Sequence, residues 1–228
     1  MPEKVLIYAP RKKSLNNVSL ATAINSAIVQ TNDQGMQQMR HLENTAYTSM
    51  PWKNGGGVTT EIIVHPAKAS MADFDWRISM ANVAQDGPFS IFPGIDRTLC
   101  ILEGKGMSLS IDAREPVALT MASDPLPFAA DVPVDAVLAD GPIVDLNVMS
   151  RREQYSHRVE RHCTTLTVQS TGSTATIIFA VDPVSVSSAG QTVHLQRRDS
   201  LLLERGAGFA VEGMEEAGRF FVVTFDQV

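Results

Sequence analysis

The chain has 228 residues, a formal net charge of −6 at pH 7 and a pI near 5.3, with 44% hydrophobic and 19% charged residues. This acidic balance argues against a protein that grips nucleic acid, which needs clustered Lys and Arg. The length suits one large β domain or two small ones, and no apolar run approaches the roughly 18 residues of a membrane span. We therefore expect a cytoplasmic protein with no nucleic-acid and no membrane partner.

The first 38 residues carry the least information. A basic cluster at 11–13 precedes a stretch at 15–29 that weakly imitates a secretory signal, but Asn and Ser residues interrupt its apolar part. We expect residues 1–38 to form a poorly ordered extension, with a targeting peptide as the alternative. The folded domain is expected to begin at Met36 or at Met39.

A glycine-rich loop, MPWKNGGG at 50–57, follows a short first strand expected at 42–47. Consecutive glycines are costly to order, so they make sense where the backbone needs positive φ or approaches something closely. The nucleotide-binding patterns GxxxxGK[ST] and GxGxxG are absent. We interpret the loop as a pocket rim that presents Trp52, Lys53 and Asn54. The alternative is a flexible surface turn.

Two strands after this loop alternate strictly between their two faces. The strand expected at Val58–Val64 places Glu61 among apolar neighbours, where a carboxylate is either solvated or paired inside a barrel. The strand expected at Phe74–Ala81 places Arg77 and Ser79 on one face. A guanidinium fork beside a hydroxyl suits a carboxylate, which Arg binds bidentately. The alternative is an outer face with a solvated Arg.

The segment 86–106 combines two turn dipeptides, a strand and a glycine turn. Gly-Pro and Pro-Gly bound an apolar piece, Phe89–Phe92, and the strand is expected at Thr98–Leu102. Asp96 and Arg97 stand directly before that strand. The segment therefore reads as loop, strand, turn and returning strand.

A later strand, Ile143–Met149, again has one apolar and one polar face. Asp145 and Asn147 alternate on its polar face as Arg77 and Ser79 do on theirs, so these strands can wall one polar cavity. Short strands separated by Gly and Pro turns continue to the C-terminus, and few segments have helical periodicity. This regular spacing of short strands and turns is typical of a β-barrel or β-sandwich.

Several motifs in order resemble the HutD/Ves family. They are MPWKNGGG at 50–57, DWRIS at 75–79, GPFSIFPGIDR at 87–97, LEG at 102–104, FAAD at 128–131 and DGPIVDLN at 140–147. The likeness covers roughly Met39 to the C-terminus. It implies an all-β bicupin fold, with two cupin-like barrels or jelly rolls in one chain. The first half would span about 39–150 and the second 151–228.

The resemblance also implies a function. The HutD family is associated with histidine utilisation in bacteria, where it is thought to tune histidine catabolism by binding an intermediate such as N-formylglutamate or urocanate. The Ves branch is described only as stress-related, and no catalytic activity is established for the family. We therefore expect a non-catalytic protein that binds a small-molecule carboxylate.

A metal site is not expected. Metal-dependent cupins place a His-x-His pair and a Glu before the Leu-Glu-Gly turn, because borderline metals favour imidazole and carboxylate ligands. Here the corresponding stretch, 93–97, has no histidine, and the five histidines are scattered. Cys100 and Cys163 lack metal-ligand spacing and are expected to pack as small apolar side chains. We predict neither a metal nor a cofactor.

A polar pocket remains, with Trp52 and Lys53 at its rim. Its expected lining is Asn54, Glu61, Arg77, Ser79, Asp96, Arg97, Asp131, Asp145 and Asn147. Arg77 is the expected anchor for a ligand carboxylate and Arg97 the alternative, while Asn54, Asn147 or Ser79 would contact the ligand's polar end. Some carboxylates must pair with the arginines, and Asp96 and Asp145 are the candidates.

Two other functions stay open. A metal-independent isomerase or hydrolase acting on a small acid or sugar would use Glu61, Asp131 and Asp145 for acid/base work. No nucleophile, base and orienting group stand together in the sequence, which weakens this alternative. A stress-related interaction protein would instead use the apolar loop Phe89–Phe92 and bind no small molecule. The protein is expected to be a monomer or a homodimer.

Overall fold

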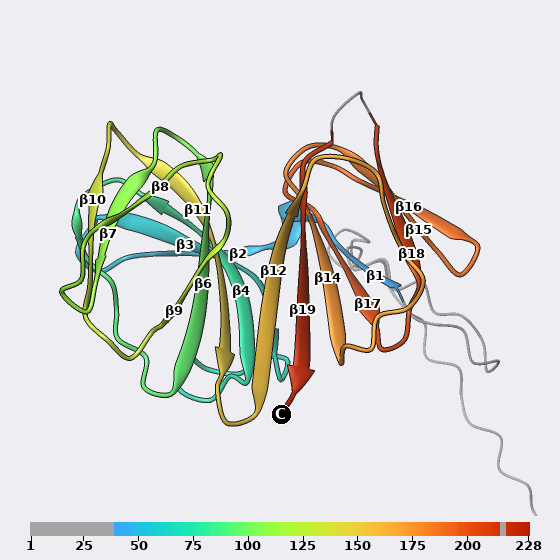
Figure 1. Ribbon diagram of the computed structural model, residues 1–228, viewed down its shortest axis with the longest axis horizontal. Coiled ribbons are helices and arrows are strands. Elements are labelled where there is room, and N and C mark those ends of the chain that lie inside the picture. The colour runs from blue at the N-terminus through green and yellow to red at the C-terminus, as the bar shows by residue number, and fades with distance from the viewer. Residues whose placement is uncertain (1–38, 215–217) are drawn as a thin grey trace, which may run out of the picture.

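The computed structural model describes residues 39–214 and 218–228, so the expected N-terminal extension lies outside the described residues. The regular secondary structure of the described chain is β-strand, apart from a 3-10 turn at Asn44–Ala46. Figure 1 shows two lobes, one built from β2 to β11 and the other from β1 and β12 to β19. The expected all-β class is confirmed.

The first lobe consists of two antiparallel sheets. The six-stranded sheet has the order β2 (Thr48–Pro51), β3 (Gly57–His65), β4 (Trp76–Val83), β11 (Ile143–Arg151), β6 (Ile95–Glu103) and β9 (Leu126–Ala129). The four-stranded sheet has the order β5 (Gly87–Pro88), β10 (Val134–Leu138), β7 (Met107–Ile111) and β8 (Val117–Leu119). The strands expected at Phe74–Ala81, Thr98–Leu102 and Ile143–Met149 are present as β4, β6 and β11, and β6 begins three residues earlier than expected, at Ile95.

The second lobe repeats this arrangement with a five-stranded and a four-stranded sheet. The five-stranded sheet has the order β1 (Met39–Leu42), β17 (Ser200–Glu204), β14 (Ala175–Ala180), β19 (Phe220–Gln227) and β12 (Tyr155–His162). The four-stranded sheet has the order β13 (Leu166–Val168), β18 (Phe209–Gly213), β15 (Val184–Ser188) and β16 (Gln191–Leu195). Each lobe has its own apolar core between its two sheets, around Leu99 and Leu109 in the first and Ile178 and Val186 in the second.

A third apolar cluster joins the lobes through the outer faces of their large sheets. The Trp76 ring of β4 stacks on Phe225 of β19 with centroids 4.3 Å apart, and Ile78 and Phe179 are fully buried in the same cluster. The apolar face of β4 is therefore covered by the second lobe. Because that face is taken, the polar face with Arg77 points into the first lobe, and the alternative of a solvated outer Arg is excluded: Arg77 is 3% exposed.

The described chain begins in the second lobe. β1 pairs antiparallel with β17, with Met39 opposite Leu203. The strand expected at 42–47 is wrong, because this region contains the 3-10 turn, after which the Tyr47 hydroxyl donates a hydrogen bond to the Leu42 carbonyl at 3.0 Å. The halves expected at 39–150 and 151–228 thus differ from the lobes by one strand, since β1 belongs to the second lobe's sheet.

A β-bulge interrupts the alternation expected in β3. The pairing of β3 with β4 shifts register between Glu61 and Ile63. Ile62 and Ile63 are both 7% exposed, so two consecutive side chains are buried where strict alternation would expose one of them. Before the bulge, Glu61 lies on the same side of the sheet as Arg77.

Candidate functional site

A cavity of about 820 Å³ opens into the first lobe. Its floor is the inner face of the six-stranded sheet, and its mouth is formed by the glycine-rich loop, the loop between β3 and β4, and the segment after β5. Three successive rows across β4, β11 and β6 form the polar part of the floor: Arg77, Met149 and Arg97 in the first, Ser79 and Asn147 in the second, and Ala81 and Asp145 in the third.

Arg77 is held on two sides. Its Nε donates to Glu61 Oε2 at 2.8 Å, and its Nη1 donates to Ser79 Oγ at 3.1 Å. Its Nη2 is buried and has no hydrogen-bond partner among the described residues. A buried guanidinium nitrogen without a partner is costly unless a ligand supplies the acceptor.

Arg97 is held differently, by aromatic rings instead of an acid. Its guanidinium carbon lies 5.2 Å from the Phe89 ring centre, 5.4 Å from Phe92 and 5.8 Å from Phe128, within cation–π range. The side chain is buried and its Nε has no partner among the described residues. Burial lowers the pKa of Arg97 to about 10, with Asp145 opposing and Arg77 adding to the effect. Arg97 is still a cation at neutral pH.

Asp145 and Asn147 supply the acceptors of the floor. Asn147 Nδ2 donates to Asp145 Oδ1 at 3.1 Å, which leaves Asp145 Oδ2 and Asn147 Oδ1 buried without partners in the described chain. Burial raises the pKa of Asp145 to about 7, while the Asn147 hydrogen bond and the Arg97 charge oppose the shift. The floor thus offers two unsatisfied donor groups on the arginines and two unsatisfied acceptors.

The glycine-rich loop has the geometry that its glycines require. Gly55 has φ +73°, and a Cβ on Gly57 would lie 2.4 Å from the Asn82 carbonyl oxygen. The loop is fixed by Trp52, whose Nε1 donates to Thr59 Oγ1 at 2.7 Å, and by Asn54, whose Oδ1 accepts from the Gly56 N–H at 3.1 Å. This is an ordered rim.

The structure brings most of the expected site residues together. Eight of them line the cavity: Trp52, Lys53, Asn54, Arg77, Ser79, Arg97, Asp145 and Asn147. Glu61 reaches the cavity only through its ion pair with Arg77. Asp145 hydrogen-bonds to Asn147, and its interaction with Arg97 is one of charge without a direct hydrogen bond.

Asp96 and Asp131 do not line the cavity, which corrects their expected place in the pocket. Asp96 precedes Arg97 on β6 and therefore points to the opposite side of the strand. Both carboxylates bind Arg152, at 2.7 Å and 3.0 Å, and its guanidinium lowers the pKa of Asp131. Sequence reasoning gave Arg152 no role.

Sequence reasoning gave no role to several residues that line the cavity. Met149 continues the alternation of Asp145 and Asn147 and was detectable by that spacing. Met71 and Gln85 come from loops, where no periodicity points to a direction.

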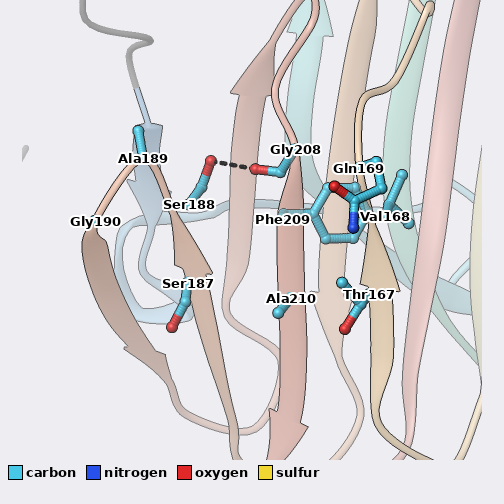
Figure 2. A pocket seen from close by; sticks show the side chains of 10 residues that line it. All are labelled: Thr167, Val168, Gln169, Ser187, Ser188, Ala189, Gly190, Gly208, Phe209 and Ala210. Atoms are coloured by element: carbon cyan, nitrogen blue, oxygen red, sulfur yellow. Dashed lines mark hydrogen bonds between the residues drawn. The ribbon is translucent and has the colours of Figure 1, made fainter.

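A smaller hollow of about 290 Å³ lies in the second lobe (Figure 2). Its lining is neutral: Thr167, Val168, Gln169, Ser187, Ser188, Ala189, Gly190, Gly208, Phe209 and Ala210. The Ser188 hydroxyl donates to the Gly208 carbonyl at 2.6 Å, so one of its few polar groups is already engaged. The charged cavity of the first lobe is the better candidate site.

Within residues 39–214 and 218–228, no group of three or more His, Cys, Asp or Glu side chains is placed to hold a metal ion. None of the helical structure in these residues is long and apolar enough to cross a membrane.

Fold and cavity define a cupin-like all-β protein with a buried, arginine-lined pocket, and sequence comparison gives its family. The HutD family model matches residues 44–221, so the chain belongs to the HutD family. A protein of Pseudomonas putida, described as an uncharacterized 21.2 kDa protein in the hutC 3′ region, is 34% identical over 82% of this chain and 97% of its own length. Protein Ves of Citrobacter koseri is 35% identical over 57% of this chain and 66% of its own length.

Solved structures agree with this assignment. A conserved protein of unknown function from Pseudomonas aeruginosa PAO1 superposes with a TM-score of 0.76 and 31% identity, covering 82% of this chain and 98% of that one. HutD from Pseudomonas fluorescens SBW25, solved in a formate condition, superposes with a TM-score of 0.72 and 28% identity, covering 83% and 99%. The expected membership of the HutD/Ves family and the cupin-like fold class are confirmed.

Proposed function

We propose that this protein is a non-catalytic binding protein that holds a carboxylate intermediate of histidine degradation, N-formylglutamate or urocanate, in the first-lobe cavity and thereby tunes histidine utilisation. The observation that carries the proposal is Arg97. It is a buried cation whose Nε has no partner and whose neighbours are three phenylalanines. A ligand carboxylate supplies the missing acceptor and charge.

Arg77 completes the anion site. Its Glu61 and Ser79 contacts fix the guanidinium and leave Nη2 for a ligand oxygen. Arg77, the expected anchor, is therefore one of two anchors in this proposal. Arg97 is the other, because its guanidinium is hydrogen-bonded to no acid or hydroxyl group. The unpaired oxygens of Asp145 and Asn147 accept from an N–H of the ligand, a group that N-formylglutamate and urocanate both carry.

The link to histidine degradation rests on relatives. The P. putida relative is named for the hutC 3′ region, and a structural relative is a HutD of P. fluorescens. Applied to this chain, these names favour an acid of that pathway over an unrelated one. Regulation would then follow the concentration of the bound intermediate.

Thermal unfolding with urocanate, N-formylglutamate, N-formiminoglutamate and glutamate tests the proposal. A ligand at a hundred times its Kd adds about 2.7 kcal/mol to the free energy of unfolding, which gives a clear rise in Tm. We expect one pathway acid to raise the Tm of the wild type and not that of Arg97→Met. The control Arg219→Gln, in a surface pair with Asp182 of the second lobe, retains the shift. No shift with any of the four acids would refute the proposal.

One observation favours a second function, an enzyme acting on a small acid. The buried Asp145 has a pKa raised to about 7, the range in which a carboxyl serves as general acid or base. Proton NMR of each acid incubated with the protein distinguishes the two. Turnover that is lost in Asp145→Asn would establish the enzyme, whereas saturable binding without turnover supports the binding protein.

A further inference from the structure

The first-lobe cavity has two chemically different zones. The polar floor lies deep between the sheets, with Arg77, Ser79 and Asp145 each at most 3% exposed. The mouth is instead surrounded by large apolar side chains that reach into solvent: Met50 is 42% exposed, Met71 45% and Ile91 55%.

These three side chains come from three separate segments. Met50 lies on β2, Met71 in the loop between β3 and β4, and Ile91 in the segment between β5 and β6. Single exposed apolar residues need no explanation, but three that converge on one opening do. They are three of the eight large hydrophobic side chains that are exposed in the described chain.

Several polar groups at the mouth are already engaged in hydrogen bonds that hold the loops in place. The Trp52 indole N–H donates to Thr59, and Asp86 Oδ1 accepts from the Leu138 N–H at 2.7 Å. A ligand that passes the mouth therefore meets the ring of Trp52 and the apolar side chains around it, beside the polar side chains of Lys53 and Gln85.

The cavity is also large for a small acid. Pockets that enclose drug-sized ligands occupy about 300–1,000 Å³, so about 820 Å³ accommodates much more than a glutamate derivative. A ligand that fills only the floor leaves the apolar mouth in contact with water. A ligand with an apolar body covers it and gains the free energy of burying that surface.

We infer that the cavity is built for amphipathic carboxylates: acids whose carboxylate and N–H occupy the floor at Arg77, Arg97 and Asp145, and whose alkyl or aryl body lies against Met50, Met71 and Ile91. This inference rests on the proposed carboxylate site and specifies its ligand class. A concave opening favours such a ligand over a protein partner, because proteins dock on broader and flatter surfaces.

The test is isothermal titration calorimetry of the full chain with N-acylglutamates of rising length: formyl, acetyl, butyryl and hexanoyl. Burial of each added methylene in the mouth tightens binding by about two- to fourfold. The readout is the slope of log Kd against acyl length. We expect a clear slope in the wild type and a much shallower one in the double variant Met71→Ser, Ile91→Ser, in which only Met50 of the three side chains remains.

Met121→Ser is the matched control, because Met121 is as exposed as Met71, at 45%, and lies outside the cavity. Its slope should equal that of the wild type. N-Formylglutamate binding with no gain from longer chains would overturn this inference and leave the carboxylate site standing. Tight binding of only the longer acids would support it and remove N-formylglutamate as the pathway ligand. Binding of no member would overturn this inference, and the proposed function falls with it only if urocanate also fails to bind.

Discussion

Arg97 is the residue at which stability and binding conflict most. A buried guanidinium without an acid partner loses its hydration and regains only part of that free energy from the surrounding rings. Phe89, Phe92 and Phe128 hold the side chain without neutralising it. The buried charge is therefore expected to cost stability in the unliganded protein.

Arg97→Met tests this conflict. The substitution fills a similar volume without charge, so we expect the free energy of unfolding of the unliganded protein to rise by about 1–2 kcal/mol. Urea denaturation measures it, and Arg219→Gln is the comparison. A variant that is less stable than the wild type would show that the buried cation contributes net stability.

The second prediction concerns Asp145 and the dependence of the free energy of unfolding on pH. Its pKa is raised to about 7, so the unfolded chain releases this proton near pH 4 and the folded protein only near pH 7. Between these values rising pH destabilises the fold. Asp145→Asn should therefore gain stability over the wild type progressively from pH 4 to pH 7 and by a constant amount above pH 7, as denaturation at several pH values measures. The exposed Asp124→Asn serves as control, and a gain independent of pH would contradict the account.

At the scale of the element, the glycine-rich loop depends on two glycines for different reasons. A Cβ on Gly57 would lie 2.4 Å from the Asn82 carbonyl oxygen and 3.0 Å from the Trp52 ring, so β3 and β4 would have to move apart. Gly55 has φ +73° but nothing within 4 Å of a Cβ, so alanine there meets only backbone strain.

We therefore expect Gly57→Ala to lower the free energy of unfolding by about 2–4 kcal/mol and Gly55→Ala by about 1–2 kcal/mol. Urea denaturation of the two variants side by side measures the difference. Equal losses would mean that conformational freedom alone, and not the close approach of β3 to β4, explains the glycines.

Alternation along single strands is what sequence reasoning could use, and it found the cavity floor. Arg77 with Ser79 and Asp145 with Asn147 are local period-two pairs, so their common face was readable in each strand. Asp96 was misplaced because it adjoins the strand start expected at Thr98, whereas β6 begins at Ile95 and the alternation already applies to it.

Other features were out of reach because non-local contacts determine them. The bulge after Glu61 depends on the pairing of β3 with β4, and the position of β1 depends on its pairing with β17, which is distant in the sequence. The sequence of β4 also does not show which of its faces points into the first lobe. The packing of Trp76 against Phe225 of the second lobe determines this. The loop residues at the cavity mouth follow no period at all.

At the scale of the whole molecule, His157 joins the two lobes. It lies on β12 of the second lobe, with Nδ1 2.7 Å from Ser150 Oγ and Nε2 2.9 Å from Thr98 Oγ1, both on strands of the first lobe. Burial lowers the pKa of His157 to about 4, with Asp96 opposing the shift.

The unfolded chain therefore takes up this proton near pH 6.5 and the folded protein only near pH 4, so the wild type loses stability from His157 as pH falls through that interval. This loss opposes the gain from Asp145 and the two partly cancel. In His157→Gln the acid-side loss should disappear, leaving a protein that becomes more stable between pH 6.5 and pH 4. His194→Gln, on the exposed face of β16, is the control, and an unchanged pH profile in His157→Gln would contradict the prediction.

The most direct test of the carboxylate site is a crystal structure with N-formylglutamate or urocanate at saturating concentration. The account predicts a carboxylate of the ligand within about 3 Å of Arg97 Nε and Arg77 Nη2, two buried arginine nitrogens of the cavity that have no partner in the described chain. A ligand bound elsewhere, with both nitrogens still unpaired, would contradict it.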